Sequence, residues 1–423
     1  MKEDLVSKGM GAVTLSPSNL INMKLDFSDC SYISSFKYDE SPEIQLKKND
    51  IVVVKTGSSY GKTSIVNDLP ERTTLNPQLL VLKQIKCNEN YLCYFLNSSF
   101  MRKNFEELVN GTAIPTFSQE KFGMKLYPFP PLSEQQLIVA EIEKIFTQID
   151  LLEQNKTDLQ TEIKQAKSKI LDLAIHGKLV SQDPNDEPAS ALLEKIRAEK
   201  EEKIARGELK RDKNDSYIYK STTDNCHYEK LNGKDVSIED KIPFTIPKSW
   251  QWCRLGEICE KLVDGNHNPP KGVENKTAYL MLSSRNINKN TIVDLENVRY
   301  LTKEMFEIEN KRTQLTSGDI LFTSVGSLGR SCVFHGTNNF CFQRSVTVID
   351  TKIDNYWIKY FFDSNYYQDY VIENATGTAQ LGFYMQQMSD SFVVIPPLSE
   401  QKRIVAKIEE LFSLLDQIQT NIV

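Results

Sequence analysis

Two stretches of the chain place apolar residues at alternating spacings of three and four, the pattern of a helix that buries one narrow stripe. The longer stretch predicts a helix that Ser133 caps, with Gln136 completing a capping box, and that ends near His176–Gly177. At 1.5 Å per residue, this helix is roughly 65 Å long. Each stripe needs a partner, and we expect the two to pair as a coiled coil. The predicted seam comprises Ile138, Ile142, Ile145, Ile149, Leu152, Leu159, Ile163 and Ile170, then Ile404, Ile408, Leu411, Leu415 and Ile418.

The two stretches are copies of one another. Pro130–Asp150 and Pro396–Asp416 are identical at 13 of 21 positions, at an offset of 266 residues, and both begin Pro-Pro-Leu-Ser-Glu-Gln. The same offset continues upstream, where Tyr91-Leu-Cys-Tyr-Phe95 corresponds to Trp357-Ile-Lys-Tyr-Phe361. A repeat this long exceeds the solenoid unit of about 20 to 50 residues. It predicts a duplicated domain followed by a duplicated helix, and therefore two similar surfaces.

Upstream of each helix, short β-branched runs precede an amphipathic stretch, which predicts an α+β domain. The aromatic residues of the last helical stretch are expected to face the core. The predicted strands and helices are Ile51–Val54, Leu79–Leu82 and Glu89–Val109 in the first copy, and Ile320–Thr323, Ser345–Ile349 and Asn355–Asn374 in the second.

The predicted fold is therefore α+β, with two similar globular domains separated by long paired helices. The segment between the copies predicts a short helix near Ala189–Ala205 and then a soft, polar linker. The predicted boundaries are 1–131 for the first domain, 132–180 for the long helix, 181–241 for the short helix and linker, 242–397 for the second domain and 398–423 for the second helix.

Composition excludes several classes of protein. With 423 residues, 40% hydrophobic and 26% charged, the chain can bury two or three cores. No apolar run approaches the roughly 20 residues that span a bilayer, and no signal peptide precedes the fold. Eight cysteines without a C-x-x-C pair, and only four histidines, indicate reduced thiols in a cytoplasmic protein and no metal site.

The net charge of −6 leaves nucleic-acid binding open because the acidic excess is local. Residues 129–241 carry 18 basic and 23 acidic side chains. Residues 1–128 carry 15 and 14, and residues 242–395 carry 15 and 16. The repeated domains are thus near neutral, and local basic patches can still meet phosphates.

Two motifs come close to known catalytic or nucleotide-binding signatures. Lys55–Thr63 follows a predicted strand but falls one residue short of a phosphate-binding loop, and no suitable helix follows it. We favour a glycine turn with a basic tip, Lys62 here and Arg330 in the second copy. Asn268-Pro269-Pro270 is similar to the adenine-methyltransferase motif, but Lys271 replaces its aromatic residue, so a proline-fixed loop is favoured. No residue pattern predicts catalysis.

Four features together are specific: Pro-Pro-Leu-Ser-Glu-Gln at the start of two long helices, the segment Gly177–Glu201, the segment Ile246–Cys259, and the loop Asp264-Gly-Asn-His267. On these residues the chain resembles the DNA-specificity subunits of type I restriction–modification systems. The resemblance covers nearly the whole chain. It implies a non-catalytic subunit with two target-recognition domains, each of which reads half of a bipartite site in double-stranded DNA.

The resemblance also implies partners. The paired helices would fix the gap between the half-sites and dock two modification (methyltransferase) subunits, which restriction (endonuclease and translocase) subunits then join. No cofactor is expected on this chain, because S-adenosylmethionine and ATP would bind the partner subunits. No membrane partner is expected.

The residues expected to contact DNA are chosen by loop position and side-chain type, since base edges and phosphates are reached from polar loops. In the first domain they are Ser58, Ser59, Tyr60 and Lys62. In the second they are His267, Asn268, Lys271, Ser327, Arg330, Gln343 and Arg344.

The copies differ at their beginnings. Ile242–Tyr279 of the second copy has no counterpart before the first, which begins near Gly9–Leu15, so the first domain is expected to be incomplete at its N-terminus. A truncated or silent recombining allele is therefore an alternative to an active specificity subunit. A third alternative is a DNA-modifying enzyme built on the glycine loop.

Overall fold

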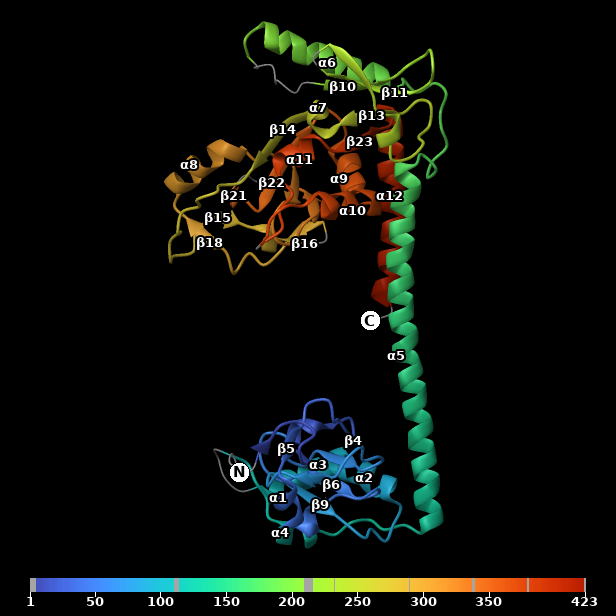
Figure 1. The fold of residues 1–423 in the computed structure, drawn as a ribbon, viewed down its shortest axis with the longest axis vertical. Helices are drawn as coiled ribbons and strands as arrows, with labels where there is room; N and C mark the ends of the chain where they lie inside the picture. Colours follow the sequence, from blue (N-terminus) through green and yellow to red (C-terminus); the bar gives the residue numbers. More distant parts are fainter. Residues whose placement is uncertain are drawn as a thin grey trace. The chain divides into compact units, whose positions relative to one another are not determined.

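The computed structural model describes residues 5–109, 114–208, 216–231, 233–288, 290–336, 339–378 and 380–421. The chain forms two compact units, Met1–Asn155 (unit 1) and Lys156–Val423 (unit 2), and each is described by itself. The long helix α5 (Leu132–Ile175) contributes its first part to unit 1 and its second part to unit 2 (Figure 1).

Unit 1 contains an α+β domain built on three small sheets. The strand orders are β1-β5-β2-β8, β3-β4 and β7-β6-β9, with β2 and β8 parallel and the other pairs antiparallel. The strands are β1 (Leu5–Val6), β2 (Ala12–Leu15), β3 (Leu20–Ile21), β4 (Lys24–Leu25), β5 (Ser31–Ile33), β6 (Ile51–Val54), β7 (Thr63–Ile65), β8 (Thr73–Leu75) and β9 (Leu79–Leu82); the helices are α1 (Ser35–Asp39), α2 (Glu89–Leu96), α3 (Ser99–Leu108) and α4 (Gln119–Gly123).

Unit 2 repeats this framework and adds to it. The sheets β14-β22-β19-β20, β18-β15-β21 and β16-β17 form its domain, and β13 pairs with β23. The strands are β13 (Gln251–Arg254), β14 (Cys259–Asp264), β15 (Tyr279–Leu282), β16 (Ile287–Asn288), β17 (Thr291–Ile292), β18 (Arg299–Leu301), β19 (Ile320–Thr323), β20 (Ser331–Val333), β21 (Phe340–Phe342), β22 (Val346–Thr351) and β23 (Phe392–Ile395); the helices are α7 (Leu255–Ile258), α8 (Lys303–Thr313), α9 (Asn355–Asp363), α10 (Asn365–Asn374), α11 (Met385–Ser389) and α12 (Leu398–Asn421).

The duplication predicted from the repeat is confirmed strand by strand. The hairpin β6–β7 with β9 corresponds to β19–β20 with β22, and the parallel pair β2–β8 corresponds to β15–β21. The predicted strands Ile51–Val54, Leu79–Leu82 and Ile320–Thr323 appear with those bounds. Unit 2 alone, among the described residues, adds β14 beside β22 and β13 beside β23.

The same glutamine fixes each domain to its following helix. Gln401 accepts a hydrogen bond from the Asp354 amide (3.1 Å) and donates one to the Pro396 carbonyl (2.8 Å). Gln135 makes the equivalent bonds to Asn88 (2.8 Å) and Pro130 (2.8 Å). Both side chains are buried, so each helix begins at a fixed point on its own domain.

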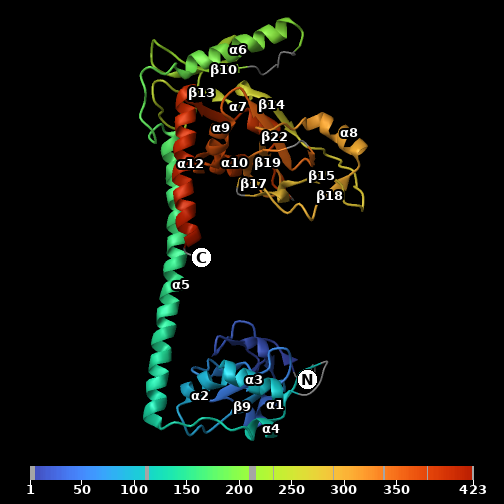
Figure 2. The same ribbon diagram turned by 180° about the vertical axis from the view of Figure 1, so that it is seen from behind.

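The second part of α5 pairs with α12, as the seam predicts (Figures 1 and 2). Leu171 and Ile175 of α5 share one buried cluster with Ile404 and Ile408 of α12, and Lys167 forms an ion pair with Asp416 (2.5 Å). Ile163 is buried, whereas the seam residues Ile145, Ile149 and Leu152 are 46%, 43% and 67% exposed.

Helix ends follow local chemistry, with one prediction confirmed and two corrected. Helix α5 ends at Ile175, where Gly177 (φ +68°) turns the chain and the Lys178 amide bonds the Leu173 carbonyl at 2.8 Å. Ser133 does not cap α5, because the helix begins at Leu132 on the Pro131 carbonyl. The predicted helices 89–109 and 355–374 are each two helices, because Ser98 and Ser364 cap a second one.

The predicted linker is wrong over 216–237. After α6 (Ala189–Ala205), which has the predicted bounds, the chain forms the sheet β10 (Ser216–Lys220), β11 (His227–Leu231) and β12 (Lys234–Ser237). Tertiary contacts stabilise it: Ile218 is fully buried, and Glu229 of β11 pairs with Arg254 of β13 at 2.9 Å. Residues 209–215 of the predicted linker lie outside the described residues.

Candidate nucleic-acid interface

In unit 2, five turns meet at one edge of the domain, which we call the loop edge: residues 265–268, 283–286, 324–330, 343–345 and 380–384. Ser345 links three of them, because its carbonyl accepts from the Ser324 amide (2.9 Å) and its hydroxyl from the Ser284 amide (3.0 Å). Asn266 donates from its amide to Phe342 (2.7 Å) and accepts from the Arg344 amide (2.9 Å). The backbone thus holds turns from distant parts of the sequence in one place.

The β19–β20 turn and the segment after α10 complete the loop edge. The Phe383 amide donates to Ser324 (2.8 Å), and Val325 forms a bridge with Gly382. Gly329 has φ +81°, and a Cβ atom there would lie 2.4 Å from Oε1 of Gln368. Glycine is therefore required at this turn by both its backbone conformation and its contact.

The equivalent turn of unit 1 has the same construction. Gly61 has φ +83°, and a Cβ atom there would lie 2.7 Å from the Phe105 ring. The segment Lys55–Thr63 connects the antiparallel strands β6 and β7, whereas a phosphate-binding loop runs from a strand into a helix. The glycines therefore shape a hairpin turn, as the sequence analysis favoured.

The structure brings most of the predicted residues of the second domain to the loop edge. Arg330, Arg344 and Asn268 are exposed there, with Ser327 and Gln343 half-buried. His267 is exposed and bonds the buried carboxylate of Asp264, which also receives Arg312. Lys271 is exposed on a different loop, which bonds β18 through Pro270 and Arg299 (3.1 Å).

Predicted residues of the first domain lie on the β6–β7 turn. Ser58 and Lys62 are exposed, and Ser59 is half-buried. The Tyr60 ring instead packs against the apolar cluster that contains Phe105.

The loop edge also holds residues that the sequence analysis missed. Arg285 is exposed there, and Leu381 and Tyr384 are 49% and 47% exposed. Within the described ranges, no ion pair joins Arg285, Arg330 or Arg344 to a carboxylate, so these charges face solvent. The repeat gives no signal for Arg285, because the matching turn Ser16–Asn19 has the same capping box but carries Ser18 at the equivalent position.

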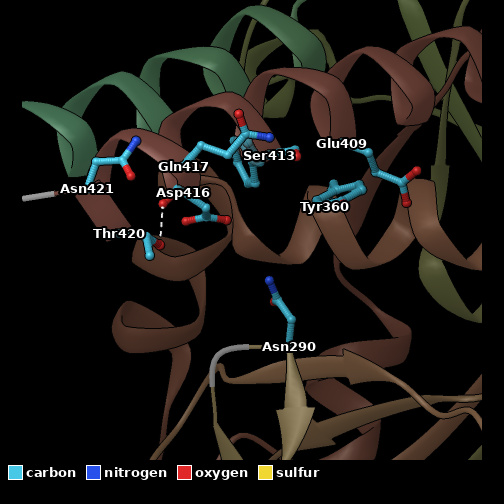
Figure 3. Close-up of a pocket in the computed structure, with 9 residues that line it drawn as sticks. Asn290, Tyr360, Glu409, Ser413, Asp416, Gln417, Thr420 and Asn421 are labelled. Atoms are coloured by element: carbon cyan, nitrogen blue, oxygen red, sulfur yellow. Dashed lines mark hydrogen bonds between the residues drawn. The ribbon is translucent and has the colours of Figure 1, made fainter. Parts of the chain in front are cut away.

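A hollow of unit 2 on its helical side has the wrong charge for nucleic acid. It measures about 600 Å³ and lies between the Asn290 loop, Tyr360 of α9 and the second half of α12 (Figure 3). Glu409 and Asp416 line it, and carboxylates repel phosphates. The loop edge, which exposes three arginines, is the better candidate.

Three buried cysteines of the described chain are poor candidates for a catalytic nucleophile. Burial raises the pKa of Cys93, Cys332 and Cys341 to about 12, so these thiols stay protonated and are poor nucleophiles near neutral pH. Within the same described ranges, no group of three histidine, cysteine or acidic side chains is placed to hold a metal ion. No described helix is long and apolar enough to cross a membrane.

Comparison with known proteins agrees with this geometry. Residues 19–161 and 247–422 match the family model described as the type I restriction modification DNA specificity domain. The chain is 25% identical to the specificity subunit of the type I restriction enzyme EcoEI of Escherichia coli, across 98% of this chain and 80% of that protein. It is also 25% identical to the EcoAI specificity subunit of the same species, across 96% and 78%.

Solved structures share the fold. One, from a study of complex assembly and conformational transition of the type I R-M system, has a TM-score of 0.61 at 14% identity, covering 99% of this chain and 90% of that one. The HsdS subunit from Thermoanaerobacter tengcongensis has a TM-score of 0.52 at 14% identity, with the same coverage.

Proposed function

Because this chain belongs to the DNA specificity subunits of type I restriction–modification systems, we propose that each of its two domains binds one half of a bipartite site in double-stranded DNA. The observation that carries the proposal is the repeated framework. Both units contain, in the same chain order, the first strand of a parallel pair, a serine-capped turn, a glycine-containing hairpin turn and the second strand of that pair.

In this proposal, different side-chain types of the loop edge make different contacts with DNA. Arg285 and Arg330 contact phosphates or guanine edges, since guanidinium groups bind both in a bidentate manner. Gln343 and Asn268 present amides, which suit adenine edges. In the first domain Lys62 takes the place of Arg330, and Ser58 lies on the same turn.

The helices supply the remaining part of the proposal. The paired seam of α5 and α12 fixes the spacing of the half-sites, and two modification subunits and then restriction subunits assemble on it. The exposed seam residues Ile145, Ile149 and Leu152 offer apolar surface for such contacts. S-adenosylmethionine and ATP bind the partner subunits, and this chain supplies recognition without catalysis.

The test is a methylation map. The chain is co-expressed with its modification subunit in a host that lacks adenine methylation, and methylated bases are located by single-molecule sequencing. A two-part motif with a constant gap is the expected result. A palindromic motif would mean that only one kind of domain reads DNA, and absence of methylation beside a working specificity subunit would contradict the proposal.

A further inference from the structure

Unit 1 carries an apolar groove next to the start of α5. It has a volume of about 290 Å³ and is lined by Tyr91, Phe95, Phe122 and the segment Tyr127–Phe129, among others. The rim is apolar as well, since Leu126 is 94% exposed and Phe129 is 69% exposed. Among the described residues of unit 1, no segment covers this surface.

The internal repeat shows what covers the same surface in unit 2. At the offset of 266 residues, Leu126–Phe129 corresponds to β23, Phe392–Ile395. Strand β23 is buried because β13 pairs with it in antiparallel register, placing Trp252 opposite Val394. Trp252 is fully buried, and its ring meets the Phe392 ring edge-on at 6.3 Å.

Unit 1 contains the residues that correspond to the part of this site contributed by α9, α10 and β23 in unit 2. The part contributed by β13 has no counterpart among the described residues of unit 1. The Tyr91 hydroxyl donates to the Pro128 carbonyl (3.2 Å), as Trp357 Nε1 donates to Val394 (3.0 Å). Ring spacings also agree: Tyr91–Phe95 is 6.4 Å and Phe95–Phe100 is 6.1 Å. The equivalent pairs Trp357–Phe361 and Phe361–Tyr366 are 6.3 Å and 5.8 Å.

Pro128 does not prevent strand addition. In unit 2 the Leu255 amide bonds the Ser391 carbonyl (3.0 Å), which fixes the alternation of the antiparallel ladder. By that alternation Cys253–Val393 is a hydrogen-bonded pair, and Trp252–Val394 is not. The Val394 N–H therefore points away from β13, so the proline at the equivalent position forfeits no hydrogen bond to an added strand.

We propose that this groove of unit 1 binds a β-strand of the form Trp-x-Trp, supplied by a separate polypeptide segment and added antiparallel to Leu126–Phe129. The second tryptophan fills the groove, as Trp252 does in unit 2. The first bonds Glu134, which is exposed, as Trp250 Nε1 bonds the equivalent Glu400 at 2.9 Å. Main-chain bonds give affinity, and the two indoles give specificity. This peptide site is separate from the DNA-reading role.

A labelled peptide with the sequence of residues 248–259 tests the proposal with the full-length chain, under reducing conditions, by fluorescence anisotropy. We expect saturable binding that weakens at least tenfold when either peptide tryptophan is replaced by alanine. Leu126→Asp in the chain should abolish binding without unfolding it, because that side chain is already exposed. Leu137→Asp, at a 71%-exposed position of α5, is the matched control and should bind normally.

A photo-crosslinking group on the peptide locates the site. Cross-links to residues 126–129 support the proposal. Cross-links to 392–395 would mean that the peptide only displaces the chain's own β13, and absence of saturable binding would equally overturn it. A chain dimer that Leu126→Asp dissociates, with no peptide binding, would assign the groove to a second copy instead.

Discussion

Gln135 and Gln401 hold the two domains to their helices with the same pair of bonds. Each side chain accepts from a main-chain amide at the start of a domain helix and donates to the carbonyl of the proline that lies two residues before its own helix. Leaving a buried amide or carbonyl without its hydrogen-bond partner lowers the free energy of unfolding by about 1–3 kcal/mol. These two residues are therefore structural, although they belong to the motif that most clearly identifies the family.

We expect Gln401→Ala to lower the free energy of unfolding by about 1–3 kcal/mol, because the Asp354 N–H and the Pro396 carbonyl lose their buried partner. Urea denaturation measures the change. Gln136→Ala, at an exposed position of α5, should stay within about 0.5 kcal/mol of wild type. Equal losses in the two variants would show that the bonds contribute nothing specific.

Glu400 introduces a pH dependence. Burial raises its pKa above the ordinary 4.5, although bonds from Trp250 and Gln182 oppose the rise. The unfolded chain then loses this proton at lower pH than the folded chain. In the window just above 4.5 the unfolded state binds fewer protons, so stability falls as pH rises.

Glu400→Gln removes that ionisation and should gain stability relative to wild type as pH rises from about 4.5 to 7. Denaturation midpoints at several pH values measure the difference. Glu134→Gln, at the exposed equivalent position, serves as the matched control. Parallel pH profiles for wild type and Glu400→Gln would contradict the assigned role of burial.

At the scale of elements, the predicted coiled-coil seam is buried in one part of α5 and exposed in another. Ile163, 5% exposed, packs within unit 2, whereas Ile149 on the same stripe is 43% exposed in unit 1. The sequence pattern is identical in both parts, because apolar spacing reports that a face needs a partner and does not say where the partner is.

We expect Ile163→Ala to lower the free energy of unfolding by about 2–5 kcal/mol, the usual range for a buried isoleucine. Ile149→Ala should change stability of the isolated chain little, because the removed methyl groups already contact water and alanine favours helix. Calorimetry measures both. If modification subunits dock on the exposed seam, Ile149→Ala should weaken their binding while leaving the isolated chain intact.

Most helices and strands could be predicted because the local sequence pattern favours the same structure that the tertiary packing requires. The strand Ile51–Val54 is a continuous β-branched run, and it is buried on both faces. The sheet of 216–237 could not be predicted in this way, because only β10 contains a fully buried residue, Ile218, and its partners lie on β13 and α6. For the loop edge, residue type located Arg330 and Arg344, but Arg285 becomes part of it only through the bond between Ser284 and Ser345.

At the scale of the whole molecule, the duplication predicts that each domain reads its own half-site independently of the other domain. Arg330→Ala should relax the recognised sequence in one half-site, and Lys62→Ala should relax it in the other. Each substitution should also weaken DNA binding and reduce the slope of log K against log salt concentration by about one. Methylation maps and binding at several salt concentrations measure this. Arg206→Ala, which removes an exposed charge paired with Glu202 on α6, is the control and should leave the motif unchanged. A change in both halves from one substitution would contradict independent domains.

The loop edge has a consequence for how such a protein can diversify. Among the described residues, its turns are joined by main-chain bonds and the Ser345 hydroxyl, while the side chains of Asn268, Arg330 and Arg344 extend from that frame. If these side chains read DNA as proposed, a mutation at one of these exposed positions changes the recognised sequence with little change in the free energy of unfolding. On that proposal, natural selection can try new recognition sequences one substitution at a time without first finding compensating mutations in the core.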